Sequence, residues 1–572
     1  MPAEPDPSPP PATSRRNSAL VGAGILASRV SGLVRERAMS HFLGTSFAAD
    51  AFTAAFRIPN LLQHLLGEGV LSASFIPVYS RLLAEEREEE AAQVAGAIAG
   101  LLAVAAGVLA LVGIVFAEPL TLLVAAGFRS RPETFELTVR LVRILFPAVG
   151  FLVLSAWCLG VLNSHRRFFL SYVAPVMLNV AQIAVLVGAG LTVFRAGFIG
   201  EGSAEQAQLG LVTWLAVGTV VGGLLQFAVQ LPTVIRLSGA PRLSLRTDLP
   251  GVRQTLGAFG PIVGARGVVQ ISAYLQVFLA SFLAVGALAV LRYAQILYLL
   301  PISLFGMAVA AAELPELSSA DRDDRTEVVG RLRHGLTRIA TFVVPTVLGY
   351  LVLGDLVVGA LFQTGEFDRI DTVAVWIVLG GYAFGLLAST ASRLLQSALY
   401  GGGDARTPAR VAIARVIVAS GLGVLLMFQL DRFGVTPDGV QLLGDLPAFG
   451  PLEQEARDAA GGGDLVRLGA AGLSVAAGVG AWLEFGLLRR TLRRDVGRFA
   501  PRWPDLRPIV LGCLAALAVA VGVRPLVGDL SPLLAGFLAV GATGGSYLAV
   551  AAGAGSAEIR SLVHATLRRL RP

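Results

Sequence analysis

The residues of this sequence that could do chemistry are charged and amide side chains set into apolar stretches. Asp50, Arg57 and His64 follow one another at intervals of seven residues. Asn60 comes three residues after Arg57, and Glu68 comes four residues after His64. These intervals predict that all five side chains lie on one face of a helix. Because a charge inside a bilayer costs free energy unless it faces a polar cavity, we interpret this face as a binding surface.

Polar residues at helical intervals recur in three other apolar stretches, one near the start of the chain and two near its middle. They are Arg29, Arg35 and Glu36 in the first stretch, Arg266, Gln270 and Tyr274 in the second, and Arg292, Gln295 and Ser303 in the third. Cationic groups predominate among them. A guanidinium group binds phosphate through paired hydrogen bonds, so the pattern favours an anionic ligand such as a phosphate or a pyrophosphate.

Sequence patterns of catalysis and metal binding are missing. The chain has no Ser/His/Asp set, no acidic pair on an exposed loop and no glycine-rich loop followed by Lys. Cys158 and Cys513 lie in apolar runs and the five His residues are scattered, so neither a disulfide nor a metal site is predicted. All 46 basic residues are Arg, and they lie between apolar runs rather than among aromatic residues on one surface. We therefore expect no enzymatic activity, no cofactor and no nucleic-acid partner.

The elements that must position the polar residues are membrane-spanning helices. Only 15% of the residues are charged and 55% are hydrophobic, whereas soluble domains carry roughly 25% charged residues. Four runs without any charged residue each exceed the roughly 20 residues that cross a bilayer; they are 94–116, 168–194, 206–235 and 530–557. Strands of a membrane barrel alternate in polarity and do not give such runs, so the fold class is all-α.

Apolar runs bounded by charges or by Pro and Gly predict about fourteen transmembrane helices. Their expected positions are 18–40, 50–78, 94–116, 137–161, 168–194, 206–235, 254–282, 287–312, 336–362, 372–399, 408–430, 466–488, 508–526 and 530–553. Alternate loops and both termini hold 27 Arg, whereas the opposite loops hold seven. Because cytoplasmic loops are rich in Arg and Lys, both termini are expected in the cytoplasm.

Short basic loops after the fourth and tenth spans are similarly placed and indicate a weak internal repeat. We expect two six-helix lobes plus two C-terminal helices around a central cavity. The expected segments are a disordered cytoplasmic N-terminus at 1–17, an N-lobe at 18–235, a cytoplasmic linker at 236–253, a C-lobe at 254–488, the last two spans at 489–553 and a basic cytoplasmic tail at 554–572. The Gly- and Pro-containing loop 431–464 is expected to be a flexible extracytoplasmic segment.

Residues 29–83 carry a series of motifs that resembles the lipid II flippases of the MurJ (MviN) family. The motifs begin at Arg29 (RVSGLVRE), Ala49 (ADAF), Ile58 (IPNLL), Gly67 (GEG) and Ser74 (SFIPVY). Further similar segments are Leu162-Asn163 with Arg167-Phe168 and Pro175, Tyr293–Gln295, Leu304–Gly306, Leu314-Pro315 and Asp404–Pro408. The resemblance covers nearly the whole chain.

The resemblance implies the two-lobed fold of the multidrug/oligosaccharidyl-lipid/polysaccharide exporter superfamily. It also implies a location in the bacterial inner membrane and transport of an undecaprenyl-pyrophosphate-linked glycopeptide, the peptidoglycan precursor, from the cytoplasmic to the outer leaflet by alternating access. Membrane lipids and other proteins of cell-wall synthesis are the further partners that such a role suggests. Together with the spacing, the resemblance gives ten candidate substrate-binding residues: Arg29, Arg35, Glu36, Asp50, Arg57, Asn60, His64, Glu68, Arg266 and Arg292.

Two positions depart from the family pattern. Gln63 and Ile296 stand where many members have arginines directed at the pyrophosphate. We hypothesise that Arg266 or Arg292 compensates. Some members bind sodium through acidic residues in the seventh and eleventh spans, which this chain lacks, so no metal site is predicted.

Two other functions stay open at the level of the sequence. One is a flippase for another polyprenyl-pyrophosphate-linked glycan, such as an O-antigen-like one. The other is a membrane scaffold that transports nothing. A scaffold has no need of a cationic interior stripe, so a cavity lined by both lobes would favour transport.

Overall fold

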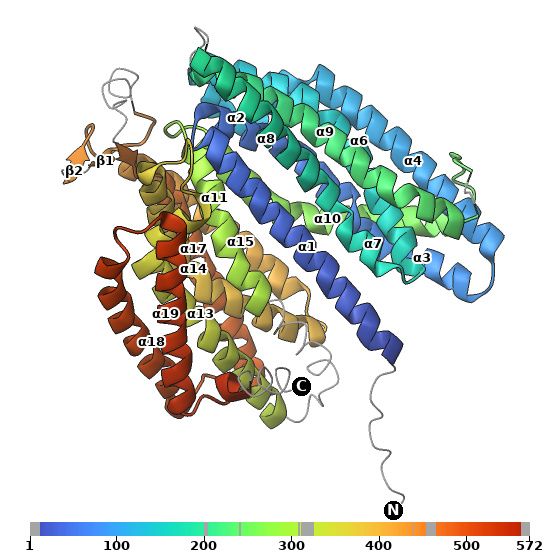
Figure 1. Cartoon of the computed structure of the whole chain (residues 1–572). Helices are drawn as coiled ribbons and strands as arrows, with labels where there is room; N and C mark the ends of the chain where they lie inside the picture. Colours follow the sequence, from blue (N-terminus) through green and yellow to red (C-terminus); the bar gives the residue numbers. More distant parts are fainter. Residues whose placement is uncertain are drawn as a thin grey trace, which may run out of the picture. The chain divides into compact units, whose positions relative to one another are not determined.

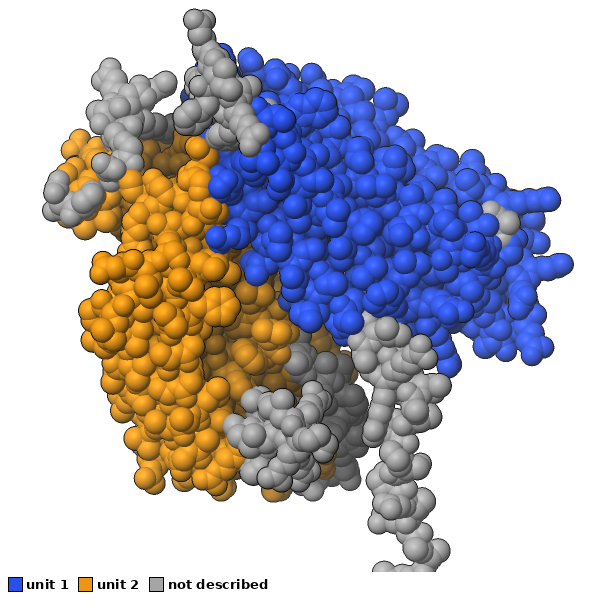
Figure 2. All heavy atoms as spheres, in the orientation of Figure 1, with its two compact units in different colours: residues 1–43, 47–274 blue, residues 44–46, 275–572 orange. Residues whose placement is uncertain are grey.

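The computed structural model describes residues 12–199, 204–239, 242–306, 309, 325–436, 439–452 and 465–561. The described chain is almost entirely helical and forms two compact units (Figure 2). Unit 1 comprises residues 1–43 and 47–274, and unit 2 comprises residues 44–46 and 275–572. The lobe boundaries expected from the sequence remain a prediction.

Unit 1 is built from long helices that pack side by side (Figure 1). Its elements are α1 (Ala12–Leu43), α2 (Phe47–Leu66), α3 (Glu68–Ala84), α4 (Glu88–Val115), α5 (Ala117–Ala125), η1 (Ala126–Ser130), α6 (Pro132–Ser164), α7 (Phe168–Val173), α8 (Pro175–Ile199), α9 (Ala204–Leu237) and α10 (Pro250–Ala280) up to Tyr274. Helix α6 begins at Pro132, where the missing N–H of proline costs nothing. It packs against α2, α4 and α9 and forms the centre of the unit.

The second expected span, 50–78, lies within the candidate span Phe47–Ala84, and its helix is interrupted at one residue. Helix α2 ends at Leu66 and α3 begins at Glu68. Gly67 forms the break, and its N–H still donates to the Gln63 carbonyl at 2.7 Å. A Cβ on Gly67 would collide with that same carbonyl oxygen, so the close turn requires glycine.

Unit 2 is a second group of helices with a small sheet at one end (Figure 1). Its elements are α11 (Ala287–Pro301), η2 (Ile302–Gly306), α13 (Arg325–Phe362), α14 (Arg369–Gly401), α15 (Arg406–Leu430), β1 (Phe433–Thr436), β2 (Gly439–Leu442), β3 (Val466–Arg467), α17 (Gly469–Val496), α18 (Trp503–Val523), η3 (Arg524–Leu526) and α19 (Pro532–Gly553). Helix α17 packs against both α14 and α15, and α19 packs against α13 and α18.

Glycines bring α14 and α17 into close contact. A Cβ on Gly385 would lie 2.5 Å from the Cα of Gly478, and a Cβ on Gly381 would collide with the hydroxyl of Ser474. Gly381 and Gly385 are four residues apart, as are Ser474 and Gly478, so each helix presents a stripe of small residues. Helices in lipid gain stability from such close packing because lipid supplies no hydrophobic drive between them.

The loop 431–464 was expected to be flexible, but its described part is anchored. Strand β1 pairs antiparallel with both β2 and β3, in the order β2-β1-β3. The side-chain amide of Gln429 donates to the carbonyl of Ala448 at 2.8 Å and accepts from its N–H at 3.1 Å. The sheet and this double hydrogen bond hold the segment at the end of α15.

The membrane-spanning character predicted from composition is confirmed. Twelve helical segments in the described parts of the chain are long and apolar enough to cross a bilayer. Helices α1 and α10, 32 and 31 residues long, are not among the twelve. The total of fourteen spans therefore stays a prediction.

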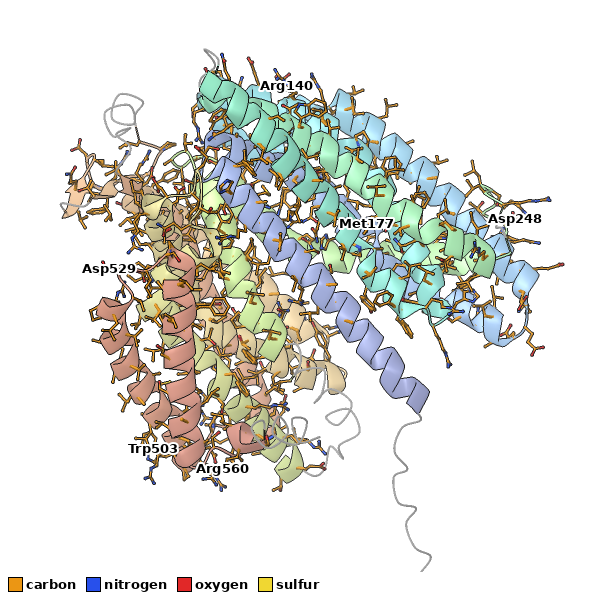
Figure 3. All side chains as sticks on the ribbon, in the orientation of Figure 1. Arg140, Met177, Asp248, Trp503, Asp529 and Arg560 are labelled. Carbon is orange, nitrogen blue, oxygen red and sulfur yellow. The ribbon has the colours of Figure 1, made fainter. Side chains whose placement is uncertain are left out.

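The long helices run from one end of each unit to the other (Figure 1). In unit 1, Arg140 and Asp248 lie toward opposite ends of the helices, with Met177 between them (Figure 3). In unit 2, Asp529 in the turn between α18 and α19 lies at the opposite end from Trp503 (Figure 3). The chain thus crosses each unit from end to end repeatedly, which a multi-pass membrane protein requires.

Candidate functional site

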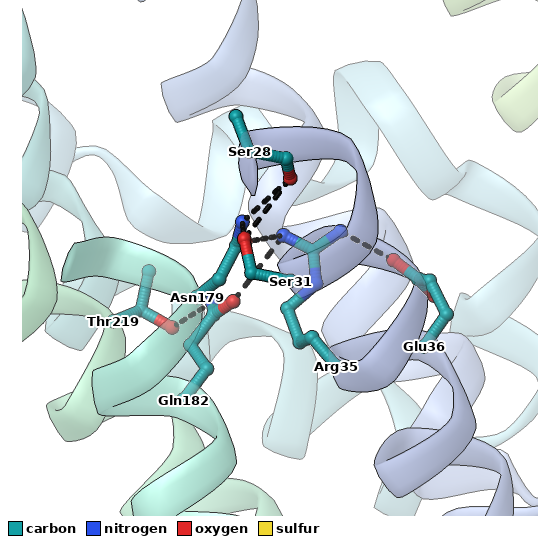
Figure 4. Close-up of polar contacts among 7 residues, drawn as sticks. All are labelled: Ser28, Ser31, Arg35, Glu36, Asn179, Gln182 and Thr219. Carbon is teal, nitrogen blue, oxygen red and sulfur yellow. Dashed lines mark hydrogen bonds and ion pairs between the residues drawn. The ribbon is translucent and has the colours of Figure 1, made fainter. Parts of the chain in front are cut away.

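Arg35 of α1, one of the predicted site residues, is held by three side chains (Figure 4). Its Nη1 donates to the Oδ1 of Asn179 at 3.0 Å and to the Oε1 of Gln182 at 3.4 Å. Its Nη2 donates to the Oε1 of Glu36 at 2.5 Å. Two neutral amides from α8 and one carboxylate from its own helix therefore orient the guanidinium group.

The two amides are oriented in turn by further hydrogen bonds (Figure 4). Asn179 donates from Nδ2 to the hydroxyl of Ser31 at 2.9 Å and to the carbonyl of Ser28 at 3.3 Å. Gln182 donates from Nε2 to the hydroxyl of Thr219 in α9 at 2.7 Å. Each amide thus turns its oxygen toward Arg35 and its nitrogen toward a hydroxyl, which fixes the position of both groups.

Sequence reasoning missed Gln182 and Thr219 and did not connect Asn179 with Arg35. The sequence did contain a signal for these residues, because Asn179 and Gln182 are two amides three residues apart in a span that has no charged residue. Residues at this interval share a helix face. Which helix they would face could not be read from that interval.

Burial strengthens the pair formed by Arg35 and Glu36. The side chain of Arg35 is 21% exposed and that of Glu36 is 5% exposed. A guanidinium group has five N–H donors, and the Nε of Arg35 is buried without a hydrogen-bond partner among the described residues. The arginine therefore has donor capacity beyond its present bonds, while its charge is balanced by Glu36.

The polar residues of α2 differ in their surroundings. Asp50 is fully buried, Arg57 and Asn60 are half-buried, and His64 is exposed. The His64 ring donates from Nδ1 to the Asn60 carbonyl at 2.7 Å, a contact within one helical turn. The helix is interrupted at Gly67, and the Glu68 side chain lies outside the described residues, so the common face predicted for five residues stays a prediction at Glu68.

Arg57 brings α2 and α10 together within unit 1. Its guanidinium carbon lies 6.0 Å from the centre of the Tyr274 ring, at the limit of a cation–π contact. The Tyr274 hydroxyl donates to the Arg57 carbonyl at 3.3 Å. The polar face that the sequence predicts for α10 therefore includes a residue, Tyr274, that contacts the polar face of α2.

The three remaining predicted site residues lie on α1, α11 and α10. Arg29 is exposed on α1, two turns before Glu36. Arg292 is half-buried on α11 in unit 2. The side chain of Arg266 lies outside the described residues, although its backbone belongs to α10. The structure thus groups Arg35 with Glu36 and Arg57 with Tyr274.

Unit 2 contains a buried ion pair of its own. The carboxylate of Glu484 in α17 accepts from Arg415 of α15 at 2.5 Å and from Gln396 of α14 at 2.8 Å. Glu484 is 3% exposed. Because removing one partner would leave a buried charge, this cluster fastens three helices together.

A metal site is not evident in the described parts of the chain. No three His, Cys, Asp or Glu side chains there are grouped closely enough to hold an ion. The chemistry available at Arg35 is instead the binding of an anion by directed N–H groups.

Comparisons with known proteins agree on one family. Residues 39–436 match the family model described as lipid II flippase MurJ. The chain is 33% identical over 501 residues to the lipid II flippase MurJ of Burkholderia cenocepacia, covering 86% of each chain. It is 31% identical over 420 residues to a probable lipid II flippase MurJ of Rhizobium tropici, covering 73% of this chain and 76% of that one.

Solved structures show the same fold. A lipid II flippase MurJ in an inward closed conformation superposes with a TM-score of 0.68 and 21% identity, covering 95% of this chain and 100% of that chain. An inward-facing multidrug transporter of the MATE family gives a TM-score of 0.59 with 14% identity, covering 82% of this chain and 94% of that chain. The exporter fold expected from the sequence motifs is therefore confirmed.

Proposed function

The chain belongs to the lipid II flippase MurJ family, and on this premise we propose that it moves lipid II across the bacterial inner membrane. The cargo is the peptidoglycan precursor linked to undecaprenyl through a pyrophosphate. It passes from the cytoplasmic to the outer leaflet by alternating access, with no chemical change to the cargo. The similarity to the Burkholderia cenocepacia flippase supports this cargo.

The arrangement around Arg35 is the observation that carries the proposal. A pyrophosphate brings negative charge among apolar helices, which costs free energy unless a cation receives it. Asn179 and Gln182 hold the Arg35 guanidinium at 3.0 and 3.4 Å before any ligand arrives. Less side-chain entropy is then lost when the anion binds. Arg35 is therefore prepared to receive the pyrophosphate.

Glu36 gives the site a means of release. Its carboxylate accepts from Nη2 of Arg35 at 2.5 Å, so the pair is neutral when no substrate is bound. An incoming anion competes with Glu36 for that N–H group. A carrier must bind its cargo tightly enough to take it up and weakly enough to let it go, and this competition serves the second need.

The other candidate residues supply charge and polarity around this pair. We assign to substrate binding the remaining members of the predicted set: Arg29, Asp50, Arg57, Asn60, His64, Glu68, Arg266 and Arg292. Because Arg35 and Glu36 cancel each other, the long-range attraction for an anion comes from the further arginines. Both termini lie in the cytoplasm in this proposal, since Arg gathers in the loops on their side.

The two alternatives predict different outcomes. Another lipid-linked glycan shares the pyrophosphate, so Arg35 would serve it equally and only the glycan would differ. A scaffold would use Arg35 solely for packing, and replacing it would lower stability without affecting any transport step.

Complementation of a bacterium depleted of its own lipid II flippase tests the proposal. The unaltered chain should restore growth, and Arg35→Ala at the same membrane level should not. Arg489→Ala serves as the matched control, because Arg489 is an exposed arginine in α17. Growth with Arg35→Ala equal to that of the control would refute the role of Arg35. Failure of the correctly inserted, unaltered chain would point to another glycan.

A further inference from the structure

A basic cleft lies in unit 1, away from the residues that hold Arg35. It has a volume of about 500 Å³ and is formed by the turn between α6 and α7 together with the end of α9. Its lining includes Arg166, Arg167 and Arg236 beside Phe168, Phe169 and Leu237. We call it the Arg166 cleft.

The positive charge of the three arginines in the Arg166 cleft is not balanced by any acidic residue of its lining. All three arginines are exposed, and no acidic residue lines the cleft. None of the three forms an ion pair in the parts of the chain that the structure describes. Three guanidinium groups around one hollow repel one another, and an anion that enters relieves this repulsion.

Arg166 occupies a backbone position that usually takes glycine. Its φ is 58°, in the left-handed region. The N–H of Arg166 donates to Asn163 and the N–H of Arg167 donates to Leu162, which is the pattern that ends a helix with a left-handed residue. The chain therefore has an arginine at the rim of the cleft, at a position where glycine would fit the backbone better.

The cleft combines cationic groups with an apolar border. Phe169 is 44% exposed, and Ile235, beside Arg236 at the end of α9, is 42% exposed. The segments Phe168–Thr192 and Gln206–Leu237 are both apolar enough to span a bilayer, so the cleft lies where spans end. An amphipathic ligand at the ends of these spans would place its polar head beside the arginines and its apolar tail along the apolar surface of the helices.

We propose that the Arg166 cleft binds the phosphate headgroup of an anionic phospholipid from the adjoining leaflet. The phosphate oxygens accept from the guanidinium N–H groups, and the acyl chains lie along the exposed apolar faces of α7 and α9. This lipid is a resident ligand of the protein and is separate from the transported cargo.

Lipid binding to the purified full-length chain tests the proposal. Phosphatidylglycerol is titrated into the protein in a neutral detergent, and bound lipid is counted by native mass spectrometry. Arg167→Gln/Arg236→Gln should weaken binding about 25-fold, on the basis of about fivefold for each arginine at a membrane surface. The control Arg489→Gln/Arg490→Gln removes two exposed arginines in the C-terminal half of α17 and should bind as the unaltered chain does.

A second variant guards against misfolding of the first. Arg166→Gly suits the left-handed backbone, so it should fold at least as stably while binding phosphatidylglycerol about fivefold more weakly. Phosphatidylcholine should bind poorly to every form. Equal affinity of all variants for phosphatidylglycerol would overturn the proposal.

Two competitors identify the source of the phosphate. Inorganic phosphate should not displace the lipid at equal concentration, because it lacks the acyl chains. Undecaprenyl pyrophosphate should displace it no better than phosphatidylglycerol displaces itself. If inorganic phosphate displaced it fully, the cleft would be a phosphate site, and if undecaprenyl pyrophosphate were preferred it would be a cargo site; either result would overturn the assignment to a phospholipid.

Discussion

Asn179 accepts a hydrogen bond from the Arg35 guanidinium over 3.0 Å, although the two residues are 144 positions apart in the chain. The same amide donates to Ser31, one turn before Arg35 on α1. The Asn179 side chain of α8 thereby fixes both the position of α1 relative to α8 and the direction of the Arg35 side chain. The positioning of the candidate site thus depends on the contact between α1 and α8.

Asn179→Leu should reduce lipid II transport about tenfold while the protein remains inserted. Leucine has a similar size but cannot accept from Arg35, and a lost hydrogen bond to a charged group is worth about 1.5–3 kcal/mol. Flipping by the purified variant in vesicles measures the effect. Gln226→Leu is the matched control, since it removes a buried amide that bonds Ser155 at 3.0 Å within the same unit. If both variants lost transport equally, Asn179 would have only a structural role.

Gly67→Ala should destabilise the protein by about 1–3 kcal/mol, the usual range for overpacking. The added Cβ would meet the Gln63 carbonyl oxygen, which is backbone and cannot rotate away. Thermal unfolding in detergent measures this change. Gly107→Ala provides the comparison, because a Cβ there meets nothing within 4 Å and Gly107 lies inside α4. Equal unfolding temperatures for the two variants would show that the break between α2 and α3 is not needed.

Arg266→Ala should abolish transport, because we propose that Arg266 replaces the arginines absent at Gln63 and Ile296. Arg266 lies eight residues before Tyr274 on α10, an interval that keeps both on one helix face. Adding Ile296→Arg should restore part of the activity. Arg253→Ala, at an exposed position of the same helix, should transport normally. Normal transport by Arg266→Ala would show that no compensation occurs at this position.

The chain should lose stability as the pH falls below about 6.5, the usual pKa of histidine. Burial lowers the pKa of His165, in the turn between α6 and α7, and the nearby Arg167 lowers it further, while Glu88 raises it. The unfolded chain then binds a proton that the folded chain resists, so the contribution of His165 is present above the unfolded pKa and is lost below it. Unfolding temperatures from pH 8 to pH 5 should fall less steeply for His165→Gln. An identical slope for the variant would exclude His165 as a source of the pH dependence.

Hydropathy along the chain was enough to locate the helices of this protein. The predicted span 206–235 corresponds to α9 at Ala204–Leu237, and the predicted span 408–430 corresponds to α15 at Arg406–Leu430. Helices in a membrane satisfy their own backbone hydrogen bonds, so an apolar run of sufficient length has few other structures available. Local motifs likewise identified the family and drew attention to Arg35 and Glu36.

Only the tertiary structure decided which polar groups meet. No interval in the sequence relates Arg35 to Asn179 or Gln182, because the register between two packed helices depends on how their side chains interlock. The break at Gly67 also escaped prediction, since a glycine in an apolar run reads equally well as close helix packing. Periodicity reports which face of a single helix is polar, and the neighbour of that face is determined by long-range packing of the whole unit.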